Sequence, residues 1–211
     1  MAALRGIHKG SLPELTPVLE NWLNLMEEDW EGEDVPWWYG EQTHVSQFAG
    51  AVWQCSEGWA FEEFATGKGR LAHRPTRKKI TYHGRGDIAF CVKGQNFMAE
   101  AKMFFPSIAT QARKNAVWIR ARLDAALRAV AQCPSWPKHK KLGMLFLSPC
   151  LPLSQKVKCD AQIEGFIDTL QNMAAWTMAW TFPKRTRYPH VDAYLFPGTV
   201  VVIRRLQGNR R

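Results

Sequence analysis

Apolar and polar residues alternate in the middle of the chain in a way that predicts two strands joined by a tight turn. Ile88, Phe90 and Val92 alternate with smaller residues, and a second apolar segment covers 97–104. Residues 93–96 between them have the composition of a short hairpin turn. The pattern therefore predicts an antiparallel hairpin at the centre of the chain.

Helical and strand-like patterns lie on both sides of this hairpin. Val45, Phe48 and Val52 recur at helical spacing, whereas 142–147 is a continuous apolar run, typical of a strand that is buried on both faces. The predicted elements are, in chain order, a helix at 41–53, strands at 59–64, 87–92 and 97–104, a helix at 110–130 that ends before Pro134, and a strand at 142–147.

The rest of the chain continues the same α/β pattern. Apolar spacing predicts helices at 15–26 and 160–176, and the turn signal Pro197-Gly198 precedes a strand at 200–203. No Ser/Gly-rich linker interrupts the 211 residues, so we expect a single domain. Its expected parts are an acidic and aromatic helical extension at 1–40, a core at 41–148, and a helix and strands at 149–211 that complete the same domain.

Two carboxylates and an amine are expected to converge on the predicted hairpin. Side chains alternate along a strand, so Glu100 and Lys102 face the same side. Asp87 lies a few residues before the turn and Glu100 a few residues after it, which lets the two acids approach each other. Neighbouring carboxylates repel unless a cation lies between them, and Mg²⁺ prefers such oxygen ligands, with Mn²⁺ as the alternative. Lys102 would then hold a phosphate or position an attacking water.

These residues resemble the core motif of the PD-(D/E)XK, or restriction-endonuclease-like, nuclease superfamily. The family motif is an Asp on one strand and Glu-x-Lys on the next, which Asp87 and Glu100-Ala101-Lys102 match, although Gly86 stands where the family often has Pro. The family core runs helix, three strands, helix, strand, which is the order predicted for 41–148. The resemblance implies a restriction-endonuclease-like core, in which a central mixed sheet is flanked by helices.

The resemblance also implies an activity and a set of site residues. Asp87, Glu100 and a Glu from the first core helix, here Glu41, would be the metal ligands, and Lys102 would assist the nucleophile or the transition state. The implied function is Mg²⁺-dependent hydrolysis of DNA phosphodiester bonds. RNA stays open as an alternative substrate, because no RNA-specific motif can be recognised in the chain.

The charge distribution favours a polyanionic partner such as DNA. The chain has 28 Lys and Arg against 19 Asp and Glu, and residues 42–211 alone carry 26 bases and 10 acids. Basic residues on the helix at 110–130 are equally typical of a solvated helix face. A basic cluster between the first two core strands could hold the phosphate backbone beside the site; its members are Lys68, Arg70, Arg74, Arg77, Lys78 and Lys79.

The N-terminal segment is acidic, most strongly over 27–34. Such a run is typical of solvated surface, and the alternative is that the segment covers the basic groove or binds a partner, including a second copy in a homodimer. Five cysteines without a Cys-x-x-Cys pair argue against a zinc ribbon, and an odd count without a signal peptide predicts reduced thiols in the cytoplasm. No apolar run is long enough to span a bilayer, so no membrane partner is expected.

A non-catalytic interpretation stays open at this point. Asp87 and Glu100-Ala101-Lys102 could form an ordinary ladder of cross-strand ion pairs on an exposed sheet face, which stabilises a protein little. The domain would then be a nucleic-acid- or protein-binding module that keeps the nuclease fold. The two interpretations differ in metal dependence, because only the enzyme needs Mg²⁺.

Overall fold

A seven-stranded mixed sheet forms the centre of the computed structural model, which describes residues 4–28, 34–69, 81–109, 112–133, 139–173, 176–184 and 190–207. Neighbouring strands are antiparallel except β4 and β5, which run parallel and are joined through α3. The strands, in their order across the sheet, are β1 (Arg5–His8), β7 (Thr177–Thr181), β10 (Thr199–Arg205), β5 (His139–Leu147), β4 (Gln95–Phe104), β3 (Thr81–Val92) and β2 (Trp59–Gly69).

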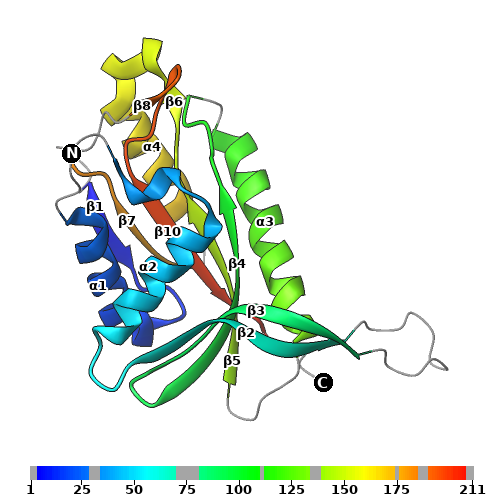
Figure 1. The fold of residues 1–211 in the computed structure, drawn as a ribbon. Helices are drawn as coiled ribbons and strands as arrows, with labels where there is room; N and C mark the ends of the chain where they lie inside the picture. Colours follow the sequence, from blue (N-terminus) through cyan, green and yellow to red (C-terminus); the bar gives the residue numbers. More distant parts are fainter. Residues whose placement is uncertain are drawn as a thin grey trace.

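Helices cover both faces of this sheet (Figure 1). α1 (Thr16–Glu27) and α2 (Glu41–Trp53) pack on one face, and α3 (Ala112–Gln132) and α4 (Cys159–Gln171) pack on the other. A small second sheet contains β6 (Leu151–Pro152), β9 (Tyr194–Leu195) and β8 (His190–Val191), and short 3-10 turns lie at Pro13–Leu15, Pro36–Trp38 and Leu153–Lys158. The chain is therefore an α/β protein with a mixed sheet flanked by helices, as the sequence predicts.

The continuous apolar run of β5 has a direct structural explanation. Met144 and Phe146 pack into the core on the α1 and α2 side, whereas Leu145 and Leu147 pack into the core on the α3 and α4 side. A strand that is covered on both faces needs apolar residues at successive positions. The prediction of a buried strand at this place is confirmed, and β5 begins three residues earlier than predicted, at His139.

β2 and β3 extend well beyond the predicted strands. Both continue as a two-stranded arm, whose register runs out to Lys68↔Tyr82 and Gly69↔Thr81 and which passes the C-terminal end of α3 in Figure 1. Alternating hydrophobicity predicts only the parts of strands that have one buried face. The arm is held by backbone pairing in a segment without that alternation, so the sequence pattern misses its outer half.

The described part of the N-terminal segment belongs to the core. β1 forms one edge of the seven-stranded sheet, and the apolar stripe of α1, including Leu19, Trp22 and Met26, is fully buried between α2 and the sheet. Residues 29–33 of the acidic run lie outside the described residues. Removal of residues 1–35 would therefore take away a sheet strand and a core helix.

The remaining sequence predictions agree with the fold in most respects. α2 has the predicted bounds, β10 covers the strand predicted at 200–203, and α4 ends at Gln171 rather than 176. The five cysteines, Cys55, Cys91, Cys133, Cys150 and Cys159, are free thiols. None of the helices in the described ranges is long and apolar enough to cross a bilayer.

His44 is a core histidine on the inner face of α2. Its ring is fully buried, stacks on Phe146 with centroids 5.0 Å apart, and places Nε2 3.4 Å from Ser148 Oγ, which itself donates to the Trp37 carbonyl. Burial lowers the pKa of His44 from 6.5 to about 4, with a smaller opposing effect of a hydrogen bond to the Trp37 backbone. The neutral imidazole is therefore the form that the fold requires.

We expect His44 to make the protein less stable in mild acid. The unfolded chain takes up a proton below about pH 6.5 and the folded chain only near pH 4, so unfolding becomes easier as pH falls between these values, by about 2 to 3 kcal/mol in total. His44→Phe keeps the stack on Phe146 and should remove that part of the pH dependence, measured by urea unfolding at several pH values. His8→Gln leaves His44 in place and should behave like the wild type; an unchanged pH dependence in His44→Phe would contradict the assignment.

Candidate functional site

Asp87 lies where β3 stops pairing with β4 and where its pairing with β2 is interrupted. The β3–β4 pairing runs from Val92↔Gln95 to Ile88↔Ala99 and stops there, one residue before Asp87. On the other side, the β2–β3 pairing includes Glu62↔Ile88 and Phe64↔Gly86 but skips Glu63, whose φ of 45° is in the left-handed region. Asp87 is skipped on the facing strand, so the pairing is interrupted at one residue of each strand while the register stays the same.

Gly86 allows β2 to bend over β3 at this point. A Cβ added to Gly86 would lie 2.3 Å from the ring of Phe64, so the ring occupies the space that any other side chain would need. Phe64 in turn packs against Met98, Val130 and Cys133, below the end of α3. The glycine that departs from the family motif is therefore required by local packing, and a proline or alanine there would displace Phe64.

The Asp87 carboxylate takes over a hydrogen bond that the departing strand no longer makes. Its Oδ2 accepts from the backbone N–H of Ala101 at 2.7 Å. This amide lies beyond the last β3–β4 pair, where β4 has lost its strand partner on that side. The bond fixes Asp87 against the β4 segment that carries Glu100 and Lys102.

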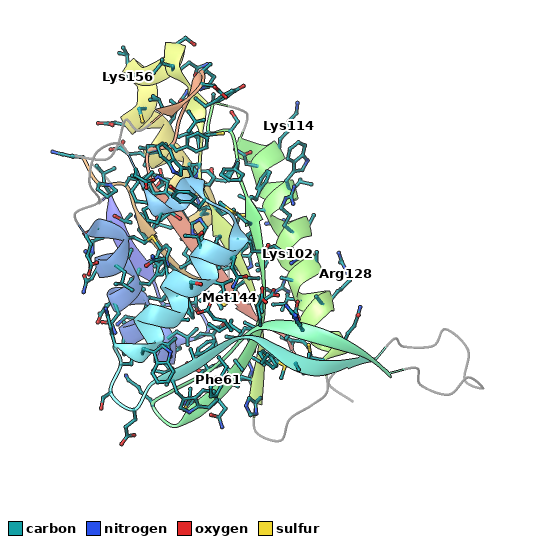
Figure 2. All side chains as sticks on the ribbon, viewed as in Figure 1. Phe61, Lys102, Lys114, Arg128, Met144 and Lys156 are labelled. Carbon is teal, nitrogen blue, oxygen red and sulfur yellow. The ribbon has the colours of Figure 1, made fainter. Side chains whose placement is uncertain are left out.

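Glu41, from α2, approaches the segment of β4 that carries Lys102. It is the first residue of α2, and its Oε1 lies 3.5 Å from Lys102 Nζ, with both side chains a little over one-third exposed. Lys102 Nζ also donates to the carbonyl of Ala101. Figure 2 shows Lys102 in the region between α2 and α3, above the point where β3 leaves the sheet.

The electrostatics of Glu41 reflect a second carboxylate nearby. Partial burial raises the pKa of Glu41 above its ordinary value; the positive charge of Lys102 lowers it, the negative charge of Asp87 raises it, and the amide of Met103 lowers it. Asp87 and Glu41 therefore interact through space although they come from different elements. Two carboxylates that repel each other beside a solvent-accessible amine are a favourable environment for a divalent cation.

Glu100, two residues before Lys102 on β4, contacts the C-terminal end of α3. Its side chain is buried, 4% exposed, and the Sγ of Cys133 at the end of α3 lies 3.6 Å from its Oε1. The sequence predicts that Glu100 and Lys102 face the same side of the sheet. In the structure, the Glu100 carboxylate contacts Cys133, and the Lys102 amine contacts Glu41. Among the residues that the structure describes, no group of three or more His, Cys, Asp and Glu side chains is close enough to hold a metal ion.

The donor set nevertheless fits a hard cation with few protein ligands. Mg²⁺ commonly binds through one or two carboxylates and keeps several waters. Glu41 and Asp87 supply two such carboxylates, and their charges act on each other, although burial is the main reason that the pKa of Glu41 is raised. These two residues would hold the ion.

The predicted phosphate-binding cluster cannot be placed. Arg70, Arg74, Arg77, Lys78 and Lys79 lie outside the described residues, and so does the side chain of Lys68, whose backbone belongs to β2. Sequence reasoning also missed Cys133 as a partner of Glu100 and Phe64 as the reason for Gly86. No sequence signal could have found these two contacts, because each depends on how side chains of different elements pack against one another.

Comparisons of the chain with protein-family models, with curated proteins and with solved structures found no match. The functional argument therefore depends on the geometry of this site and on the resemblance of its residues to a known motif.

Gly86→Ala should destabilise the fold by about 1 to 3 kcal/mol, because the new methyl group would overlap the Phe64 ring. Gly165→Ala is a matched control, since Gly165 is on α4 with open space around it, and alanine there should be neutral or stabilising by up to about 1 kcal/mol. Unfolding free energies from urea titration measure both effects.

A double-mutant cycle tests whether the clash with Phe64 causes the destabilisation by Gly86→Ala. Phe64→Leu should relieve the overlap, so Gly86→Ala should cost clearly less in the Phe64→Leu background than in the wild type. Equal costs in the two backgrounds would show that the ring is not what excludes a side chain at position 86.

Proposed function

We propose that this protein is a metal-dependent nuclease with a restriction-endonuclease-like core, which hydrolyses phosphodiester bonds of DNA. The observation that carries the proposal is the convergence of Asp87, Glu41 and Lys102, from β3, α2 and β4, at the place where β3 and β4 separate. An incidental ladder of ion pairs on the β3–β4 hairpin would not include Glu41, which comes from the helix α2 and not from the hairpin.

The order of elements supports the same proposal. α2, β2, β3, β4, α3 and β5 follow one another in the helix, three strands, helix, strand order of the PD-(D/E)XK superfamily, and β4 pairs with β5 in parallel. The motif residues lie on the two central strands of this set, and Glu41 begins the helix that precedes them. A mixed α/β sheet by itself does not determine function, so the site residues carry the argument.

Each residue has a role that its position allows. Glu41 and Asp87 would hold Mg²⁺ or Mn²⁺, which when bound lowers the pKa of a coordinated water and offsets charge on the phosphate. Lys102, partly exposed beside Glu41, would hold a phosphate oxygen or orient the attacking water. Glu100 would complete the ligand set from β4 only if its carboxylate leaves Cys133, so we assign it the weaker metal contact.

The electrostatic field of the protein favours this substrate class. Residues 42–211 carry 26 bases and 10 acids, an excess that attracts phosphate backbones and makes binding sensitive to salt. DNA is the proposed substrate.

Purified protein should cleave plasmid or linear DNA with Mg²⁺ or Mn²⁺ and lose this activity in EDTA. Asp87→Asn and Lys102→Met should each lower the cleavage rate by about 100-fold or more, since each removes a charge that acts on the reacting phosphate or its metal. Melting temperatures should change little for Lys102→Met, because its side chain is partly exposed.

Two variants control for the loss of charge alone. Lys156→Met removes a lysine at the other end of the molecule in Figure 2, and Asp168→Asn removes an exposed acid from α4; both should cleave like the wild type. Salt-dependent DNA binding without cleavage under any metal condition would instead favour the non-catalytic binding module. Cleavage that persists in Asp87→Asn and in Lys102→Met would rule out this site.

The activity should fall in acid in a way that depends on metal concentration. Glu41 must lose its proton to bind a cation, and its raised pKa means that activity is lost as pH falls through that value. More Mg²⁺ competes with the proton and should move the acidic limb of kcat/KM to lower pH. In Glu41→Gln, residual activity should have an acidic limb that no longer moves in this way; a limb that still moves as in the wild type would place the titrating ligand elsewhere.

A further inference from the structure

The outer face of α3 carries an exposed aromatic ring among basic residues, next to the candidate site. Trp118 is 58% exposed and lies off the buried stripe of α3, which contains Ile119, Leu123 and Val130. A tryptophan is costly to leave in water, because its large apolar surface gains most from burial. An exposed one at a fixed place on a helix therefore suggests a ligand.

Neighbouring side chains hold this ring in position. Trp118 and Phe104 have centroids 5.9 Å apart with planes tilted by 54°, and the guanidinium of Arg122 lies 4.6 Å from the centre of the Phe104 ring. Phe104 is 8% exposed and anchored in the core. Trp118 therefore rests against a buried ring while most of its surface stays open to solvent.

The charge of α3 selects the kind of ligand. Lys114, Arg120, Arg122 and Arg128 are exposed, and the one acid of the helix, Asp124, pairs with Arg204 at 3.1 Å. Lys114, Trp118 and Arg122 follow at intervals of four residues and so lie along one side of the helix. A row of cations with an aromatic ring between them complements phosphates and a base.

Position connects this surface with the candidate site. Phe104 follows Lys102 on β4 by two residues, which corresponds to about 7 Å along a strand. Figure 2 shows Lys114 near one end of α3 and Arg128 toward the end that lies nearer Lys102. The basic face of α3 thus runs alongside the strand that carries the site.

We propose that Trp118, supported by Phe104 and flanked by Lys114 and Arg122, is a stacking platform for an unpaired base of single-stranded DNA that extends from the candidate site. This inference rests on the nuclease function proposed above, which names DNA as the ligand, and adds the strand form. A base in a duplex has its faces covered by its neighbours, whereas an unpaired base offers a face to Trp118.

Fluorescence anisotropy in EDTA tests the platform without cleavage. The probes are a labelled oligothymidylate of about 12 nucleotides and an abasic strand with the same number of phosphates. Trp118→Ala should raise Kd for the oligothymidylate by about 5- to 100-fold and leave Kd for the abasic strand nearly unchanged. Trp118→Phe should restore most of the affinity, and Val117→Ala, at an equally exposed neighbour, should bind like the wild type.

A second pair of variants tests the phosphate contact independently of the ring. Arg122→Gln should weaken binding of both strands and lower the salt dependence of Kd, whereas Arg120→Gln, on another side of the helix, should have a smaller effect. The inference is overturned if Trp118→Ala binds the oligothymidylate as the wild type does. Tighter binding of duplex DNA or of the matching RNA strand by the wild type would equally overturn it.

The two proposals fail in different ways. Metal-dependent cleavage that is lost in Lys102→Met but unaffected by Trp118→Ala on single strands would leave the nuclease and remove the platform. Binding of single strands that depends on Trp118, in a protein that cleaves nothing, would leave the platform and remove the nuclease.

Discussion

The arrangement of the candidate site depends on one hydrogen bond, from the backbone N–H of Ala101 to the carboxylate of Asp87. β3 separates from β4 after Ile88↔Ala99, so the segment of β4 that follows Ala99 loses its strand partner on the β3 side. An amide left unpaired in a partly buried place costs about 1 to 3 kcal/mol. Asp87 supplies the missing acceptor at 2.7 Å, and the separation of the strands leaves room for Glu41 and Lys102.

The hydrogen bond from the Ala101 N–H does not require a charged acceptor at position 87. The side-chain oxygen of an asparagine would accept the same hydrogen bond without adding charge. Burial raises the pKa of Glu41, Lys102 lowers it, and Asp87 adds a negative charge close enough to raise it further. A partly buried carboxylate with a raised pKa beside a second carboxylate is typical of a functional site.

The sequence predicted the parts of this protein that periodicity and motif spacing control. The stripe of Val45, Phe48 and Val52 located α2, and the run at 142–147 located β5, because both patterns follow directly from burial. The same reasoning identified Asp87, Glu41 and Lys102, which the structure brings together. It also placed Glu100 beside Lys102 on β4, and the structure adds a contact of Glu100 with Cys133, 33 residues away. Contacts of this kind, like the fit of Phe64 over Gly86, depend on tertiary packing and leave no local pattern.

Trp118 illustrates a signal that was present in the sequence but needs the fold for its interpretation. Its position out of phase with Ile119 and Leu123 is visible from the spacing alone, but a solvated helix face explains basic residues equally well. The structure adds that Phe104, two residues after Lys102, supports the ring. One strand, β4, thus carries both Lys102 of the candidate site and Phe104, the ring on which Trp118 rests. A nucleic-acid strand that contacts both would be aligned by β4 itself, whatever the residues at 70–80 contribute.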